Sequence, residues 1–192
     1  MSTVHPSLDG YIAEFIARQP MFFVATAAAD GHVNVSPKGG AGTLRVIDGQ
    51  RIAYLDLTGS GVETIAHVRE LNRITLMWCA FEGTANIVRV YGTARVIPAG
   101  HPEWAEAYRH FPRHAGARAV IVVTAERISD ACGLAVPLME YQADRDGLER
   151  WADGKGEDGV REYWARRNAQ SIDGFDGLGE ADDAAAHAPI RD

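Results

Sequence analysis

The sequence predicts a mainly β protein, in which a closed or nearly closed antiparallel barrel carries a few flanking helices. Apolar stretches rich in Val, Ile, Thr and aromatic residues recur over the first two thirds of the chain, and strands favour this composition. The dipeptides Asp30-Gly31 and Asp48-Gly49 join consecutive stretches with the residues of tight hairpin turns. Few helical patterns stand between the stretches, so antiparallel neighbours are favoured over a parallel sheet.

The first predicted element is an amphipathic helix, and strands follow it. Pro20 ends the helical pattern, and the apolar residues with the spacing of one helix face are Leu8, Ile12, Phe15 and Ile16. The predicted strands span residues 21–27, 32–36, 44–47, 51–57, 73–81, 87–97 and 119–124.

Four helical regions are predicted among and after these strands. Ser60 and Glu63 have the S-x-x-E spacing of a capping box, so Ser60 is the expected N-cap of a helix that begins near Gly61. Pro102 and the aromatic residues after it predict a short helix that packs on the core. Two further regions, 145–151 and 160–169, are divided by a DGKGEDG loop.

The composition indicates one domain without a surface for nucleic acid or membranes. The 192 residues, 46% of them hydrophobic, suffice for one substantial core, expected within residues 1–178. Residues 179–192 are polar, alanine-rich and acidic, and are predicted to be disordered. A net charge of -7 argues against nucleic acid or anionic lipid as a partner, while a small anion needs only a local cationic pocket. No signal peptide or membrane span is recognised, so a cytoplasmic location is expected.

The segment 55–64 is the strongest candidate for a ligand site, because an apolar strand runs there into a glycine turn that opens a helix. The first N–H groups of a helix have no intrahelical partner and carry the positive end of its dipole. Gly59 and Gly61 would let an anion approach them closely. Hydroxyl donors in the segment are Thr58, Ser60 and Thr64. An ordinary strand-to-helix turn would show the same motif, so other segments must support the site.

A second glycine-rich segment, 34–42, supplies the candidate cation. Ser36 and Lys38 stand at the end of a strand, and Gly39 with the glycines after it lets the backbone bend around a ligand. A surface lysine in a hairpin loop has the same pattern. Two polar turns at strand ends in one small barrel nevertheless favour a shared anion site.

The energetics require more than a helix terminus. Such a terminus contributes about 0.3 to 2 kcal/mol, whereas micromolar affinity requires about 8 kcal/mol. A phosphate joined to a large planar ring fits best, because apolar strands and Trp78 could cover the ring. Arg89, between two valines of a strand, could contact the ligand, face solvent or form an ion pair.

No constellation of side chains indicates catalysis without a cofactor. No Ser-His-Asp, paired-carboxylate or thiolate pattern stands out, so no catalytic residue is assigned and a cofactor would carry the reaction of an enzyme. Cys79 and Cys132 lie in apolar surroundings and are expected to be buried, reduced thiols. Pro112 interrupts the helical spacing of His110 and His114, and no metal site is expected.

Three segments, taken in order, resemble the pyridoxamine 5'-phosphate oxidase-like family of flavin-binding split barrels. They read FFVATAAADGHVNVSPKGG, RIAYLDLTGSGVETIAHVRELNRITLMWCAFEG and NIVRVYGTARVI. The resemblance runs from about Phe22 to Leu178, and it is strongest to a branch with SPKG, TGSG, CAFEG and a C-terminal SIDG. It implies a split β-barrel and a homodimer with FMN at the subunit interface.

The candidate cofactor-binding residues combine this resemblance with the two turns, the central arginine and the tryptophan. They are Ser36, Lys38, Gly39, Leu57, Thr58, Gly59, Ser60, Glu63, Thr64, Trp78 and Arg89. Glu63 and Thr64 stand where the vitamin-processing oxidases carry a basic pair, so oxidation of pyridoxamine phosphate is not expected.

The leading functional hypothesis is an FMN-binding oxidoreductase, in which the flavin exchanges hydride with a small organic substrate. A deazaflavin-dependent reductase ranks lower, because its longer acidic tail would need more cations than Lys38 and Arg89. A non-catalytic flavin or haem protein is the third hypothesis, and the lack of an evident proton-transfer residue favours it slightly.

Overall fold

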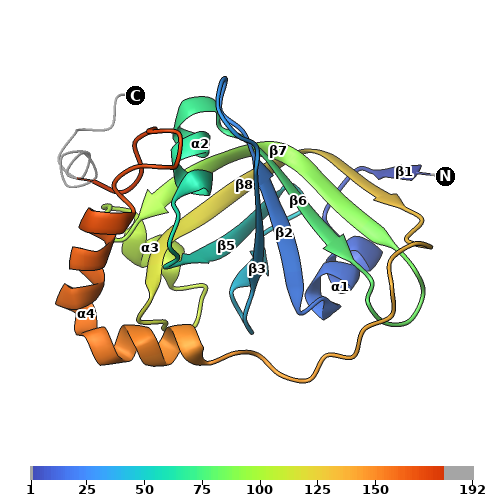
Figure 1. Ribbon diagram of the computed structural model, residues 1–192. Coiled ribbons are helices and arrows are strands. Elements are labelled where there is room, and N and C mark those ends of the chain that lie inside the picture. The colour runs from blue at the N-terminus through green and yellow to red at the C-terminus, as the bar shows by residue number, and fades with distance from the viewer. Residues whose placement is uncertain (1, 180–192) are drawn as a thin grey trace.

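The structure, a computed structural model, describes residues 2–179. One antiparallel sheet dominates it, and helices lie at its ends and on one face (Figure 1). The strands are β1 (Ser2–His5), β2 (Met21–Thr26), β3 (Asn34–Gly39), β4 (Leu44–Val46), β5 (Arg51–Leu57), β6 (Arg73–Cys79), β7 (Ile87–Pro98) and β8 (Ala117–Ala131). The helices are α1 (Gly10–Arg18), α2 (Glu63–Leu71), α3 (Trp104–Tyr108) and α4 (Gly147–Arg167).

The sheet curls into a half-barrel. Its strand order is β3-β2-β6-β7-β8-β5-β4, and β1 pairs with β8 outside this path. Every strand pair is antiparallel. Within residues 2–179 no ladder joins β3 to β4, so the barrel is split rather than closed. The predicted antiparallel split barrel is therefore confirmed.

The two longest strands bend at an irregularity in their ladder. The register of β7 and β8 shifts between Tyr91 and Gly92, which is the local distortion that turns a strand. A Cβ at Gly92 would collide with the backbone carbonyl of Thr124, so glycine is required for this close approach.

The main core lies inside the curl of the sheet. α1 contributes Ile12, Phe15 and Ile16, and α2 contributes Ile65 and Val68. Strand β5 is buried on both faces, because alternate residues of it enter this core and a smaller second cluster. Trp104 and Tyr108 of α3 pack against the second cluster with their rings stacked 4.7 Å apart. The aromatic face of the short helix is thus a packing surface, as predicted.

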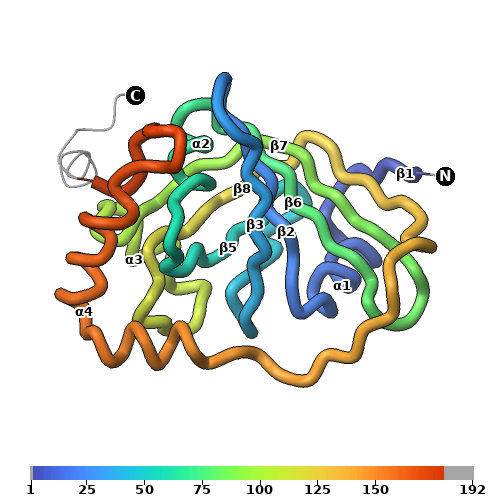
Figure 2. Tube along the Cα trace, in the orientation of Figure 1, coloured from blue at the N-terminus to red at the C-terminus, as the bar shows by residue number. Residues whose placement is uncertain are grey.

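The C-terminal part of the chain wraps around the sheet. An extended segment of residues 132–146 leaves β8, passes below the sheet and enters α4 at the opposite side (Figure 2). α4 bends at Gly156, whose φ of 67° is not helical. The two predicted helical regions are confirmed as two limbs of α4, but helical structure continues up to the bend.

Several predicted boundaries were wrong. α2 begins at Glu63 with Val62 in the N-cap position and without a side-chain cap, so the capping box of Ser60 and Glu63 is not formed. Cys132 is exposed, whereas Cys79 is buried, and both are free. β1 was not predicted, and β8 is longer than the predicted strand 119–124. Apart from Gly179, the predicted disordered tail lies outside the described residues.

Candidate functional site

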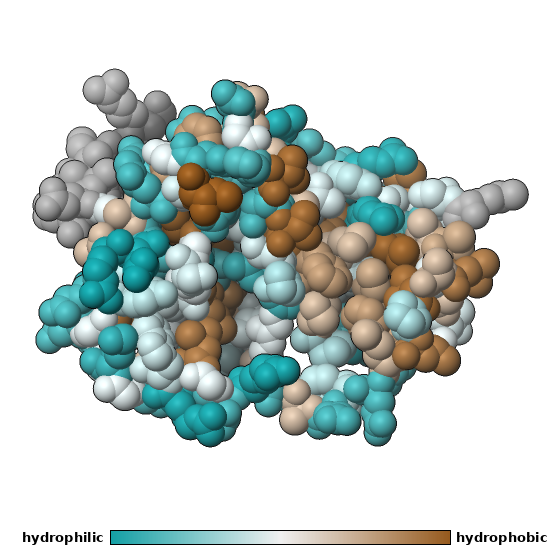
Figure 3. Space-filling model, viewed as in Figure 1, coloured by the Kyte–Doolittle hydropathy of each residue, from teal (hydrophilic) through white to brown (hydrophobic). Residues whose placement is uncertain are grey.

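A large open cleft lies where the edge of the sheet faces the C-terminal segment. It encloses about 1460 Å³, which exceeds the size of most small-molecule pockets. The end of β3, the turn after β5 and the start of α2 form one side, while the extended segment and α4 form the other. Figure 3 shows this face hollowed below its centre, with a band of surface passing beneath the hollow.

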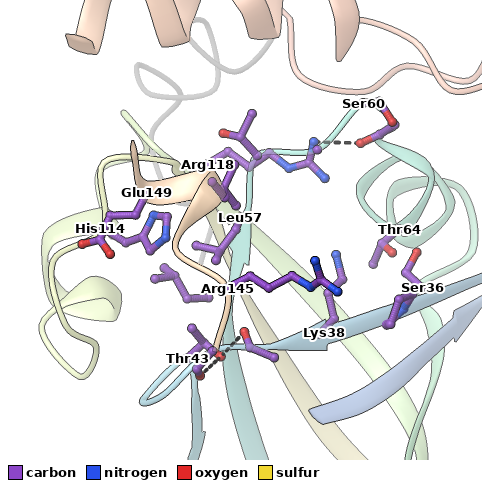
Figure 4. Close-up of a pocket in the computed structure, with 18 of the residues that line it drawn as sticks. Ser36, Lys38, Thr43, Leu57, Ser60, Thr64, His114, Arg118, Arg145 and Glu149 are labelled. Atoms are coloured by element: carbon purple, nitrogen blue, oxygen red, sulfur yellow. Dashed lines mark hydrogen bonds between the residues drawn. The ribbon is translucent and has the colours of Figure 1, made fainter. Parts of the chain in front are cut away.

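The cleft brings together nine of the eleven candidate binding residues. These are Ser36, Lys38, Gly39, Leu57, Thr58, Gly59, Ser60, Glu63 and Thr64. They come from two segments that are far apart in the sequence, and β5 and β3 carry both segments to the same end of the sheet. In Figure 4, Ser36, Lys38 and Thr64 face Arg145 across the hollow.

The other two candidates lie elsewhere. Trp78 is only 1% exposed and stacks on Phe22 in the core, with the ring centroids 5.6 Å apart. Arg89 stands opposite Met77 and Ser129 in the centre of the sheet and does not line the cleft. The expected ring surface from Trp78 and the expected second cation from Arg89 are thus absent from this cleft.

A buried charge cluster forms the floor of the cleft. Asp56 is fully buried and accepts hydrogen bonds from Lys38 Nζ at 2.5 Å and from Arg118 Nε at 2.8 Å. Burial by itself would raise the pKa of Asp56, but the two cations lower it to about 2. One carboxylate therefore balances two cations, and the cluster keeps a net charge of +1.

Arg118 was not found by the sequence analysis, although it holds the site together. Its Nη1 donates to the carbonyl of Gly61 at 2.8 Å and to Oδ1 of Asn168 at 2.9 Å. It thereby links β8 to the turn after β5 and to the end of α4. The available signal was an arginine within an apolar strand, the same signal that singled out Arg89.

Gly116, just before β8, and two residues at the end of α4 also hold the turn after β5. Thr58 Oγ1 donates to the carbonyl of Gly116 at 2.7 Å and accepts from Trp164 Nε1 at 2.8 Å. Asn168 Nδ2 donates to the carbonyl of Gly59 at 3.1 Å. The Thr58 hydroxyl therefore donates its hydrogen within the protein and cannot donate it to a ligand.

Glu63 partly fills the space in which an anion was expected. Its carboxylate folds back over Gly61, where a Cβ would collide with it, and Oε1 accepts from the backbone N–H of Ile172 at 3.3 Å. A negative charge therefore stands at the start of α2. The cationic part of the cleft is the Lys38 and Arg118 side rather than the turn alone.

Further cations line the outer part of the cleft, and the sequence analysis did not assign them to it. They are Arg113, Arg145, Arg166 and Arg167, all exposed. Arg145 points into the hollow toward Lys38 (Figure 4) and has no ion-pair partner among residues 2–179. Asp144 and Glu149 line the cleft as well, so the cationic excess is local.

A second hollow adjoins the first and encloses about 770 Å³. Phe22, Trp78 and Phe81 line it together with Met139 and Tyr141 of the extended segment. Both hollows share the glycine-rich start of the loop after β3. Trp78 thus lines this second hollow, although it is almost fully buried.

Comparison with known proteins assigns the chain to a family. The profile of the family described as Pyridoxamine 5'-phosphate oxidase matches residues 8–132, more than half of the chain. The chain belongs to the pyridoxamine 5'-phosphate oxidase family. The matched residues contain the whole sheet except β1 and carry the charge cluster of Asp56.

One curated relative carries the same family name, and solved structures resemble the chain in fold. The Pyridoxamine 5'-phosphate oxidase family protein ustO of Aspergillus flavus is 36% identical over 211 residues, which cover all of this chain and 81% of the relative. A crystal structure of a HupZ variant from Group A Streptococcus has a TM-score of 0.53 at 24% identity and covers 65% of this chain and 99% of its own. Another HupZ crystal structure has a TM-score of 0.48 at 26% identity, with coverages of 60% and 86%. The first HupZ structure supports the fold.

No group of three or more His, Cys, Asp or Glu side chains within residues 2–179 is placed to hold a metal ion. No helix in the same range has the length and apolar character to cross a membrane.

Proposed function

We propose that the chain is an FMN-dependent oxidoreductase of this family and that the cleft holds the cofactor. The observation that carries the proposal is the cluster of Lys38, Asp56 and Arg118, because its net positive charge faces a cleft lined by hydroxyls and apolar side chains. Family membership supports a flavin over other ligands with a phosphate and a planar ring.

The donor set fits a phosphate. Lys38 and Arg118 supply the charge, and Thr64 and Ser60 add hydroxyls on the same side of the cleft. Charge-assisted hydrogen bonds of this kind are about twice as strong as neutral ones. Leu57, Leu148 and Ile172 offer the apolar surface that a ring system would cover.

A bound flavin would supply hydride exchange with an organic substrate. The chain itself would bind and orient the two reactants and exclude water. It would also hold a proton at His114, whose Nδ1 accepts the N–H of Gly116 at 3.0 Å, so that the neutral imidazole carries its hydrogen on Nε2. Burial lowers the pKa of His114, against the opposing pull of Glu149 and Asp153, and this favours the neutral form.

A homodimer with the cofactor at the subunit interface belongs to the same proposal. Val33 and Val35 are 73% and 62% exposed on the edge strand β3 and the turn before it, and Ile172 is 74% exposed at the rim of the cleft. An exposed apolar patch next to a half-open cleft is typical of an interface. The open side of the cleft would then be closed by the partner subunit.

The proposal is tested by purifying the full chain and recording its visible spectrum. Yellow protein that releases FMN on heating, or colourless protein whose thermal unfolding shifts upward with added FMN, is the expected result. Colourless protein with no shift at saturating FMN would refute it. Steady oxidation of a reduced nicotinamide by the loaded protein would separate an enzyme from a non-catalytic flavin or haem carrier.

A deazaflavin is the second candidate. The four arginines in the outer part of the cleft give it more support than the sequence alone gave. Arg113, Arg145, Arg166 and Arg167 surround the entrance, and a longer acidic tail would have partners there. Thermal shifts with FMN and with the deazaflavin, measured side by side, decide between the two. Charge reversal at Arg145 should affect the deazaflavin more strongly, because its tail reaches farther outward.

A further inference from the structure

Asn34 connects the two hydroxyls that flank the inner wall of the cleft. Its Nδ2 donates to Thr64 Oγ1 at 3.1 Å and to Thr26 Oγ1 at 3.1 Å. Its Oδ1 accepts from Ser36 Oγ at 2.8 Å. Ser36 and Thr64 both line the cleft and lie one above the other in Figure 4, whereas Asn34 does not line it.

The amide of Asn34 has one orientation that satisfies its surroundings. In the orientation above, both N–H groups have an acceptor and only one carbonyl lone pair is free. The reverse orientation would give Oδ1 two hydroxyl donors, but one of the two N–H groups would have no acceptor. Because only the first orientation gives both N–H groups an acceptor, it is the one assigned.

The network continues inward from Asn34 through Thr26 to His67. Thr26 Oγ1 accepts from Asn34 and lies 3.2 Å from Nδ1 of His67. The His67 ring is 1% exposed and packs edge-on against Phe175, with centroids 6.1 Å apart. The network thus begins in the core and ends at the cleft.

The consequence is that the two hydroxyls have opposite polarity toward a ligand. Thr64 Oγ1 accepts inside the protein, so its hydrogen is available to a ligand acceptor such as a phosphate oxygen. Ser36 Oγ donates inside the protein, so it offers only lone pairs and needs a ligand O–H or N–H. Ser36 is therefore not a phosphate donor, contrary to what the sequence suggested for the strand end.

We propose that Asn34 is a positioning residue that sets this polarity, and that the inner wall thereby selects a phosphate monoester that carries a hydroxyl or N–H donor next to the phosphate arm. This deepens the proposed function and rests on it, because FMN has both groups. Thr64 would serve the phosphate, and Ser36 would serve the part of the flavin that riboflavin shares.

The test compares dissociation constants for FMN and for riboflavin, which lacks the phosphate, in the full chain. Thr64→Val removes the donor at nearly constant volume and should weaken FMN roughly 10- to 100-fold while leaving riboflavin nearly unchanged. Ser36→Ala should weaken both ligands by about the same factor. Thr43→Val is the matched control, since Thr43 lines the same cleft but its hydroxyl donates to the backbone carbonyls of Gly39 and Gly40, and it should leave the ratio of the two constants unaltered.

Asn34→Asp tests the positioning role. A carboxylate has no N–H, so the Thr64 hydroxyl would turn to donate to it, and FMN should weaken selectively. If Asn34 acts through Thr64, the loss in the Asn34→Asp/Thr64→Val double variant should be smaller than the product of the two single losses. A multiplicative loss, or equal weakening of both flavins in Thr64→Val, would overturn the inference.

Failure of the inference and failure of the proposed function give different results. A wild-type chain that binds neither flavin removes the proposed function. A wild-type chain that binds FMN tightly, while Thr64→Val retains the wild-type ratio, removes only the inference. Thr64→Val also covers the case in which Asn34→Asp does not fold.

Discussion

At the scale of single residues, Asp56 is the most consequential side chain of the site. It is fully buried between Lys38 and Arg118, and removal of its charge would leave two cations without compensation in a poorly solvated place. We expect Asp56→Asn to lower the free energy of unfolding by about 3 to 5 kcal/mol. Urea denaturation measures this, with Asp48→Asn as the control, because Asp48 forms a comparable ion pair with Arg51 at the surface.

The low pKa of Asp56 predicts that the protein loses folding stability in acid. The folded pKa of Asp56 is about 2, below its ordinary value of 3.8, so its contribution is complete above pH 3.8 and is lost as the pH falls toward 2. This lowering of the pKa corresponds to roughly 2 kcal/mol of folding free energy. The loss of stability between pH 4 and 2 should be smaller in Asp56→Asn than in the wild type. Equal acid sensitivity of the two proteins would contradict the assignment.

At Glu63, removal of a charge is expected to improve ligand binding rather than to weaken the protein. Its carboxylate lies over Gly61 at the entrance of α2, where it would repel a bound phosphate. Glu63→Gln should therefore tighten FMN binding by roughly two- to fivefold, the range expected for one partly exposed charge. Titration of flavin fluorescence measures the change. Glu70→Gln, on the exposed part of the same helix, is the control and should have no effect.

The sequence could indicate which residues gather, but not how they are paired. Lys38 and the glycine turn stand at strand ends, and that position alone brings them to one cleft. Whether an arginine in an apolar strand faces the cleft, as Arg118 does, or lies in the middle of the sheet, as Arg89 does, depends on the neighbour of that strand. Strand pairing is a long-range property that local patterns do not contain. The role of these residues in flavin binding stays a prediction.

At the scale of elements, a surface ion pair fastens the hairpin of β2 and β3 to the loop after α4. Asp173 accepts from the backbone N–H of His32 at 2.8 Å and lies 2.6 Å from its Nδ1. These contacts lower the pKa of Asp173 and raise that of His32. The contribution of His32 is therefore present below pH 6.5 and is lost as the pH rises through the raised pKa. That of Asp173 is lost only when the pH falls below 3.8.

We expect Asp173→Asn to return the pKa of His32 toward 6.5 and to speed hydrogen exchange of the amides in residues 171–174. Proton NMR titration of the imidazole and exchange mass spectrometry give the two measurements. Asp176→Asn, a nearby carboxylate without this contact, is the control. An unchanged His32 titration in Asp173→Asn would show that the two elements are not coupled.

Local patterns predicted most elements and placed their ends less well. The apolar runs of β2 and β5 and the two Asp-Gly turns were sufficient for the hairpins. The capping box was wrong because Glu63 found a partner in the backbone of Ile172, which is distant in the sequence. β1 is four residues long and is paired only with the far end of β8, so its local composition carries almost no signal.

At the scale of the whole molecule, the half-barrel leaves its ligand cleft open and its edge strand uncovered. Val33, Val35 and Ile172 form an apolar patch at this edge, and the contact of His32 with Asp173 keeps the two contributing segments together. A stable interface buries about 800 Å² on each partner, so the patch would be the centre of a larger surface. FMN placed between two subunits would then stabilise the dimer, since a ligand favours the state that binds it.

The dimer is tested by sedimentation velocity over a range of concentrations, with and without FMN. The wild type is expected to sediment as a dimer, while Val35→Asp places a charge in the patch and should dissociate it and weaken FMN binding together. Val4→Asp is the matched control, because Val4 is a 52% exposed valine on β1 that does not line the cleft. Both variants add one aspartate to an exposed strand. A difference in their sedimentation would therefore reflect the role of Val35 in assembly. A monomer at every concentration, with FMN bound as tightly in Val35→Asp as in the wild type, would mean that one chain forms the complete site.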